Sequence, residues 1–229
     1  MATIGILLLA GESKRTGTNL KKQYVPSKSG TPLFIATYKK LRNANICDSF
    51  LFAVPKGDTK KVKEMLQEHG IKESVRLIEG GDNREQSVFL ALQEIEKTSA
   101  KTPSMVLIHD ADRPYLDKDF LTRIKTQLEK GIPFIPLLPS FDSLLRKKEN
   151  GSQYLPREEI FRVQTPQAFP FEKLYSVFKQ KEASLFSYRD EGSLYLSVYG
   201  KGLESIEGSE NNTKITTGEE LDKWRNSDE

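Results

Sequence analysis

The sequence predicts an α/β protein with a mostly parallel central sheet and helices on both faces. Short apolar runs alternate along the chain with charged segments that carry apolar residues at helical spacing. The apolar runs are continuous, which is typical of strands buried on both faces. Such alternation predicts right-handed crossovers onto a parallel sheet. We expect residues 1–229 to form a single domain, because this length suits one core.

The elements follow one another in a regular order. The apolar runs predict strands over 4–9, 49–54, 75–78, 104–108, 132–138 and 202–207. The amphipathic segments predict helices over 34–41, 59–68, 84–97, 118–129, 172–179, 190–199 and 219–224. Asp58 and Asp117 are expected as N-caps, and Gly70 is expected to end the second helix.

Residues 140–164 break this pattern. The segment is polar and charged, and 147–151 is expected to form a hairpin tip. Neither flank is low in complexity, so we interpret the segment as an arm that leaves the sheet rather than a linker.

Composition limits the functional classes. The formal net charge of +3 is too small for a protein that coats nucleic acid, and no apolar stretch approaches the ~18 residues of a membrane span. Cys47 is the only cysteine, so an intrachain disulfide is excluded and a reducing compartment is indicated. The first residues lack the pattern of a signal peptide. We therefore expect a cytoplasmic protein that binds neither membrane nor nucleic acid.

A basic loop follows the first predicted strand. Ala10 and Gly11 open it, and four cations come next: Lys14, Arg15, Lys21 and Lys22. Small residues allow backbone N–H groups to approach phosphate oxygens, and fixed cations offset their charge. The spacing matches neither a Walker A loop nor Gly-x-Gly-x-x-Gly. On this segment alone, a solvated basic turn is equally consistent.

Two further loops are expected at the same edge, because ligands bind at the carboxyl ends of parallel strands. Asp110 and Asp112 end a buried strand, where a carboxylate beside phosphates is a suitable ligand for Mg²⁺. Arg113 can bind a phosphate, although a local ion pair with Asp112 is the alternative. The turn that begins at Gly80 is consistent with a helix cap. Lys214, taken alone, is an ordinary surface lysine.

Six short motifs together resemble one family. They are Leu9-Ala10-Gly11-x-x-x-Arg15 with Lys22-Gln23-Tyr24, Gly80-Gly81-x-x-Arg84-x-x-Ser87-Val88, His109-Asp110-Ala111-x-Arg113-Pro114, Gln164-Thr165-Pro166-Gln167-x-Phe169, Asp190-Glu191-x-Ser193 and Asn212-Thr213-Lys214-Ile215-Thr216. In this order, over nearly the whole chain, they are similar to the 2-C-methyl-D-erythritol 4-phosphate cytidylyltransferases and their relatives, the ribitol-5-phosphate cytidylyltransferases.

The resemblance implies a Rossmann-like nucleotidyltransferase fold with a protruding dimerisation arm at about 140–164. It also implies transfer of CMP from CTP to a polyol phosphate, with Mg²⁺, by a homodimer. The implied roles, by position, are catalysis for Arg15, Lys22 and Lys214; nucleotide binding for Ala10, Gly11, Gly80, Asp82 and Ser87; polyol-phosphate binding for Asp110, Arg113, Ser143 and Arg157; and metal binding for Asp110. Arg157 would act from the neighbouring subunit, and Lys14 and Lys21 would be solvated neighbours.

Departures from the family pattern lie mainly on the acceptor side. Asp112 stands where the family has a small residue, and Pro156 where an aspartate usually precedes the arginine. Ser13 and Lys21 also depart, in the first loop. The motif from Gly81 to Val88 favours methylerythritol phosphate as acceptor. Ribitol 5-phosphate is the alternative, and a non-catalytic nucleotide-binding protein is the alternative from another class.

Overall fold

The computed structural model describes residues 2–10, 20–71, 75–99, 102–149 and 151–228. Its central sheet has the strand order β10-β5-β9-β4-β1-β2-β3, and β8 pairs with β5 beside β9. The strands of this sheet are β1 (Thr3–Leu8), β2 (Ser49–Val54), β3 (Arg76–Glu79), β4 (Met105–Asp110), β5 (Phe134–Pro139), β8 (Phe161–Val163), β9 (Gln167–Pro170) and β10 (Glu204–Glu207). The pairs β1–β2, β1–β4, β2–β3 and β5–β10 are parallel, which confirms the expected fold class.

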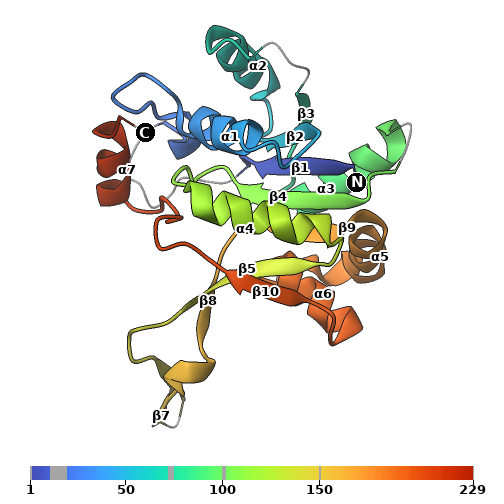
Figure 1. The fold of residues 1–229 in the computed structure, drawn as a ribbon, viewed down its shortest axis with the longest axis vertical. Coiled ribbons are helices and arrows are strands. Elements are labelled where there is room, and N and C mark those ends of the chain that lie inside the picture. The colour runs from blue at the N-terminus through green and yellow to red at the C-terminus, as the bar shows by residue number, and fades with distance from the viewer. Residues whose placement is uncertain (1, 11–19, 72–74, 100–101, 150, 229) are drawn as a thin grey trace.

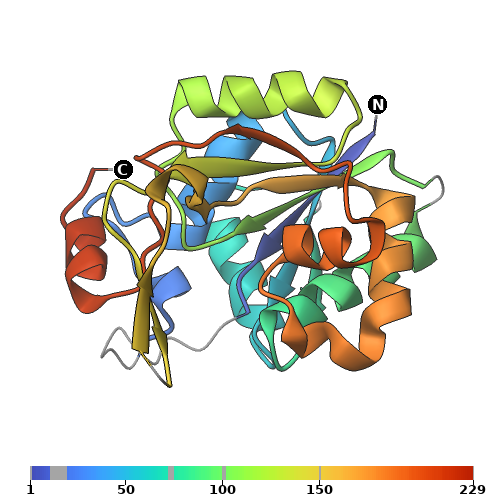
Figure 2. The same cartoon turned by 90° about the horizontal axis from the view of Figure 1, so that it is seen from below.

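Helices cover both faces of the sheet (Figures 1 and 2). They are α1 (Leu33–Asn43), α2 (Thr59–Glu68), α3 (Arg84–Thr98), α4 (Lys118–Glu129), α5 (Phe171–Lys181), α6 (Glu191–Tyr199) and α7 (Gly218–Arg225). Short 3₁₀ segments are η1 (Lys22–Tyr24), η2 (Arg157–Glu159) and η3 (Glu182–Ser187). Each helix predicted from the sequence is present.

Side-chain alternation along β1 divides the core in two. Leu7 belongs to the cluster that α1, α2 and α4 cover, whereas Ile6 and Leu8 belong to the cluster under α3, α5 and α6. Successive side chains of a strand point to opposite faces, so both faces of a continuous apolar strand are buried. The helix α7 closes a third, smaller cluster, in which the fully buried Trp224 donates from Nε1 to the Val25 carbonyl at 2.8 Å.

The sequence did not predict two antiparallel strands. β9 lies between β4 and β5 and runs against both, and β8 runs against the end of β5. Both strands are short, with three and four residues, so neither gives a periodic signal. Because β8 rejoins the sheet at 161, the excursion ends earlier than the expected residue 164.

Both expected N-cap residues occupy N-cap positions, but only one of them makes the capping hydrogen bond. Asp117 accepts a hydrogen bond from the Phe120 N–H at 2.8 Å. Asp58 occupies the N-cap position of α2, but its side chain makes no capping bond. Its Oδ2 instead accepts from the Tyr24 hydroxyl at 2.7 Å and from Lys21 Nζ at 2.6 Å. The N-cap position of Asp58 was predicted correctly, but its side chain makes no capping bond because Lys21 and Tyr24 engage the carboxylate.

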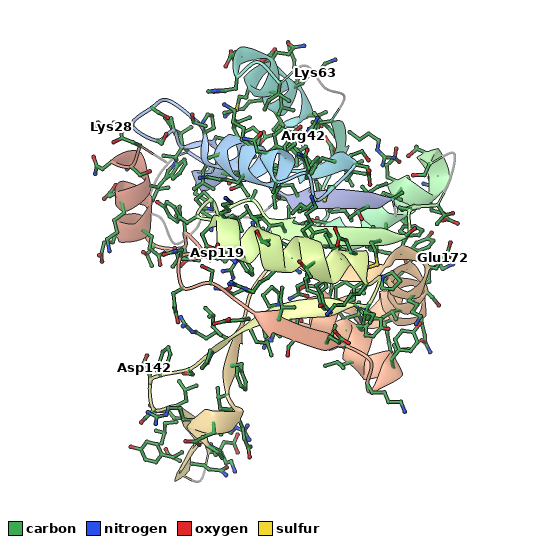
Figure 3. All side chains as sticks on the ribbon, viewed as in Figure 1. Lys28, Arg42, Lys63, Asp119, Asp142 and Glu172 are labelled. Atoms are coloured by element: carbon green, nitrogen blue, oxygen red, sulfur yellow. The ribbon has the colours of Figure 1, made fainter. Side chains whose placement is uncertain are left out.

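The arm projects from the body of the molecule (Figures 1 and 2). Its hairpin pairs β6 (Leu145–Lys148) with β7 (Gly151–Tyr154), and the pairing of Lys148 with Gly151 confirms the expected tip. Asp142 marks the start of the arm, away from the helices on the sheet (Figure 3). Among the described residues, no helix has the length and apolar character that crossing a membrane requires.

Candidate active site at the carboxyl edge of the sheet

The loops after β1, β3 and β4 meet at one edge, as the parallel topology predicts. The N–H groups of Leu9 and Ala10 both donate to the Ala53 carbonyl at 2.9 Å, and Gly80 N–H donates to the Val54 carbonyl at 2.7 Å. Ala111 N–H donates to the Leu8 carbonyl at 3.0 Å. The sheet therefore fixes the backbone on which the candidate site is built.

Gly80 is required by close packing. A Cβ atom there would lie 2.5 Å from the Cβ of Ala10 and 2.9 Å from Ser87 Oγ. The buried Ser87 hydroxyl donates to the Asn83 carbonyl at 2.8 Å and accepts from Gly81 N–H at 3.0 Å. Asp82 is exposed and pairs with Lys56 Nζ at 2.7 Å. Ser87 thus shapes this turn, while Asp82 faces solvent at its rim.

Asp110 is the centre of the candidate site. Its Oδ1 accepts from Arg84 Nε at 3.1 Å. Its Oδ2 lies 2.8 Å from Lys214 Nζ and 3.5 Å from Arg113 Nε. Burial alone would raise the pKa of Asp110, but these cations outweigh it and hold that pKa well below its usual range. The carboxylate is therefore ionised and surrounded by positive charge.

A fully buried carboxylate stands behind this centre. Glu191, in the first turn of α6, binds both terminal nitrogens of Arg84, with distances of 2.6 and 3.0 Å. Burial raises the pKa of Glu191, and the guanidinium of Arg84 opposes that shift. Burial tends to lower the pKa of Arg84, but Glu191 and Asp110 outweigh it and raise that pKa. Arg84 thus bridges two acidic groups from different elements.

Asp112 contacts Lys22 and Lys214, the two lysines expected to act in catalysis. Its Oδ2 lies 2.6 Å from Lys22 Nζ, and its Oδ1 lies 3.8 Å from Lys214 Nζ. The alternative of a local pair between Asp112 and Arg113 is wrong. The Nε of Arg113 instead faces Asp110, and one terminal nitrogen of its guanidinium donates to the Asn212 carbonyl at 2.9 Å.

A neutral histidine fixes the turn after β4. Burial lowers the pKa of His109 to about 3. Because its Nε2 lies 3.2 Å from the Arg113 carbonyl, which can only accept, Nε2 carries the proton and Nδ1 is the acceptor. The Thr165 hydroxyl then donates to Nδ1 at 2.9 Å and accepts from Asp110 N–H at 3.2 Å. His109 and Thr165 therefore hold the backbone on both sides of Asp112.

We call the seven charged residues of this site the charge network: Lys22, Arg84, Asp110, Asp112, Arg113, Glu191 and Lys214. It contains four cations and three anions, so its formal charge is positive. Each cation is held by at least one carboxylate of the network before any ligand binds. Preorganised cations of this kind stabilise negative charge that develops on phosphate oxygens.

The other residues singled out from the sequence are not part of the charge network that the structure describes. Gly11, Ser13, Lys14 and Arg15 fall outside the described residues. Lys21 was expected to be solvated, but it pairs with Asp58 at 2.6 Å. Ser143 and Arg157 are exposed on the arm, where Arg157 donates to the Phe141 carbonyl at 3.4 Å. The structure therefore unites Lys22, Asp110, Arg113 and Lys214 in the charge network, and it places the two arm residues apart from them.

Arg84 and Glu191 were missed as site residues, although both fall within the quoted motifs. Glu191 follows the N-cap Asp190, which forms a capping box with Ser193, so its position resembles an ordinary first turn of a helix. Arg84 occupies the first position of α3. Only the fold shows that these two helix starts face each other across the site.

The chain is similar to known proteins of one family. The model of the 2-C-methyl-D-erythritol 4-phosphate cytidylyltransferase family matches residues 3–224. The cytidylyltransferase of that name from Clostridium beijerinckii is 31% identical over 219 residues, which cover 94% of this chain and 93% of that protein. A bifunctional enzyme IspD/IspF from Pelagibacter ubique is 32% identical over 216 residues. That match covers 94% of this chain, which spans 55% of that longer enzyme.

A solved structure supports the fold. The 4-diphosphocytidyl-2C-methyl-D-erythritol synthase of Anaerococcus prevotii superposes with a TM-score of 0.79 at 22% identity. The match covers 98% of this chain and 96% of that one.

Proposed function

The chain belongs to the 2-C-methyl-D-erythritol 4-phosphate cytidylyltransferase family, and we propose that it transfers CMP from CTP to 2-C-methyl-D-erythritol 4-phosphate. The products are a CDP-polyol, which is an isoprenoid precursor, and pyrophosphate. The observation that carries this proposal is the charge network. It gathers Lys22, Arg113 and Lys214 from three segments of the chain at the carboxyl edge of the sheet.

The reaction needs charge stabilisation more than proton transfer. A phosphate monoester is already a competent nucleophile near neutral pH, so no general base is required. The obstacle is repulsion between two polyanions, because each pair of unit charges at 4 Å costs about 4 kcal/mol at an effective dielectric of 20. Fixed ammonium and guanidinium groups offset this cost and hold the attacking and leaving oxygens in line.

Each residue of the network has a distinct proposed role. Lys22 binds the triphosphate and stabilises the charge that develops in the transition state, and Lys214 approaches the α-phosphate. Arg113 binds the phosphate of the polyol, because only some of its five N–H donors are used by Asp110 and Asn212. Asp110 orients Lys214 and Arg113. Arg15 completes the triphosphate site in this proposal, although it lies outside the described residues.

The nucleoside lies over the first loop and the turn after β3 in this proposal. Small side chains at Ala10, Gly11 and Gly80 let the base approach the backbone. Ser87 holds the turn, and Asp82 at its rim accepts hydrogen bonds from the ribose. The Ala10–Gly80 contact supports this placement, because any larger side chain at 80 would separate the two loops.

The charge network does not have the ligands of a resident magnesium site. Both oxygens of Asp110 already face cations, and no group of three His, Cys, Asp or Glu side chains within the described ranges fits a metal ion. These residues do not fit a resident Mg²⁺, so we derive no step through the metal. Mg²⁺ that arrives bound to the CTP phosphates stays a prediction. This geometry does not favour the predicted ligation by Asp110, because both of its oxygens already face cations.

We further propose a homodimer in which the arm completes the acceptor site. The arm exposes the large apolar side chains of Phe141, Leu145 and Tyr154, and β8, which follows the arm, exposes Phe161 and Val163. Several large exposed apolar side chains on one projecting segment favour an interaction site there. Ser143 and Arg157 lie on the same arm, so a partner subunit can present them to the polyol phosphate. A single domain over residues 1–229 and a cytoplasmic location stay predictions.

The proposal is tested by pyrophosphate release from CTP and Mg²⁺ with a panel of polyol phosphates. We expect release with 2-C-methyl-D-erythritol 4-phosphate and little release without an acceptor. Release with ribitol 5-phosphate alone would reassign the acceptor but keep the reaction. CTP binding without release from any acceptor would identify a nucleotide-binding protein instead.

A further inference from the structure

Asp112 connects two lysines that come from opposite ends of the chain. It lies in the turn after β4, 2.6 Å from Lys22 Nζ on one side and 3.8 Å from Lys214 Nζ on the other. The side chains of Asp112 and Lys22 are only 13% and 15% exposed, so water screens this pair poorly.

The backbone closes the arrangement. Lys22 Nζ donates to the Ile215 carbonyl at 2.7 Å, and Ile215 N–H donates to the Asp112 carbonyl at 2.9 Å. Lys22, Asp112 and Ile215 therefore form a closed ring of contacts. This ring fixes the direction of the Lys22 side chain in the ligand-free protein.

The charge of Asp112 is less well compensated than that of Asp110. Asp110 is in contact with Arg84, Arg113 and Lys214. Asp112 Oδ1 is buried and accepts no hydrogen bond within the part of the chain that the structure describes. Apart from the lysines, nothing in the charge network neutralises this carboxylate.

We propose that Asp112 is a positioning residue that acts as an internal counter-anion for CTP. It holds Lys22 in place before CTP binds, and it competes with the triphosphate and with the leaving pyrophosphate for the two ammonium groups. The inference rests on the proposed function, in which Lys22 and Lys214 bind these phosphates. Asp112 thereby lowers the affinity for both ligands and speeds the release of pyrophosphate.

Replacing Asp112 with a neutral residue changes the charge that the phosphates meet. When a neutral residue replaces Asp112, the charge network gains one formal positive charge, and among its cations only Lys22 and Lys214 lose a contact. The phosphates then meet two lysines that no longer share their charge with this carboxylate. Tighter phosphate binding and a less well fixed Lys22 are expected together.

The test compares wild type, Asp112→Asn and Asp112→Ala. Inorganic pyrophosphate and CTP are titrated by calorimetry at several salt concentrations, and pyrophosphate release is measured under steady-state conditions. We expect both variants to bind pyrophosphate about 10-fold more tightly, which is about 1.4 kcal/mol. We also expect a steeper salt dependence, a lower KM for CTP and a lower kcat. A purely structural role would weaken binding instead.

Glu64→Gln is the matched control, because it removes one negative charge from an exposed pair with Lys60 on α2. It should leave pyrophosphate affinity unchanged. Thermal unfolding identifies which Asp112 variant is folded, and either folded variant decides the question. Unchanged or weaker pyrophosphate binding in an otherwise active protein overturns this inference alone. A wild-type protein that releases no pyrophosphate from CTP overturns the proposed function, and the inference with it.

Discussion

The charged side chains of the charge network find their partners within one chain, whereas the large apolar side chains of the arm stay exposed to solvent. In the network, buried and partly buried charged side chains from several elements hold one another, and Asp110 alone contacts three cations. On the arm, Tyr154 is 73% exposed and Phe141 is 71% exposed. In the proposed function, the residues of the charge network bind CTP from one subunit, whereas Ser143 and Arg157 on the arm reach the acceptor from a second one. Four changes test this contrast, from the largest expected effect to the smallest.

Replacing Arg84 with methionine should have the largest effect. Glu191 and Asp110 would lose their shared cation inside the protein, and breaking a buried pair costs about 3–5 kcal/mol. Chemical denaturation measures the loss of unfolding free energy. Arg76→Met is the control, because Arg76 donates to the hydroxyl of Thr98 at 2.6 Å in an exposed contact outside the charge network. Adding Glu191→Gln to Arg84→Met should restore part of the lost unfolding free energy. A loss below about 1 kcal/mol in Arg84→Met would contradict a buried pair between Arg84 and Glu191.

Lys22→Ala should lower the turnover of CTP by about 10²-fold, the scale expected when one preorganised charge-stabilising group is removed. Steady-state pyrophosphate release is the measurement. Lys21→Ala is a close control, because Lys21 pairs with Asp58 outside the network. Equal losses in the two variants would show that general loop charge, rather than the placement of Lys22, supports catalysis.

The buried His109 should make stability depend on pH. Its pKa is about 3 in the folded protein and near 6.5 when unfolded, so only the unfolded chain gains a proton as the pH falls below 6.5. The full contribution is therefore present above pH 6.5 and decreases toward pH 3. Between pH 6.5 and pH 5 the unfolding free energy should fall by about 1.5 kcal/mol. His109→Gln should lose this dependence, and a wild-type curve parallel to that of the variant would contradict the assignment.

Substitution of an exposed side chain on the arm should have the smallest effect on the unfolding free energy. Tyr154→Ser should change the unfolding free energy of the subunit by no more than about 0.5 kcal/mol, because the side chain is exposed. It should nevertheless shift the protein from dimer to monomer in analytical ultracentrifugation. Phe186→Ser, at a side chain that is 75% exposed in η3, should leave the dimer intact. The same oligomeric state in both variants would contradict the assignment of the arm to the dimer interface.

Sequence reasoning predicted the framework of the site well, because framework positions follow local rules. Continuous apolar runs such as the one in β4 indicate buried parallel strands, and such strands align their carboxyl ends. That argument alone placed the loops at Ala10, Gly80 and Asp110 on one edge. The strand β9 was missed because its four residues give no periodicity.

The partners within the charge network were not predictable in the same way. The pair between Lys22 and Asp112 spans 90 residues of sequence, and the pair between Arg84 and Glu191 spans 107. Such contacts depend on how loops from different strands pack, and neighbouring residues carry no sign of it. The alternative of a local pair between Asp112 and Arg113 was wrong for the same reason.

A crystal structure with CTP bound tests the central claim most directly. The account predicts that Lys22 Nζ lies about 3 Å from a phosphate oxygen of CTP and has moved away from Asp112, with Lys214 beside the α-phosphate. A triphosphate bound elsewhere, with the 2.6 Å pair between Lys22 and Asp112 unchanged, would contradict it.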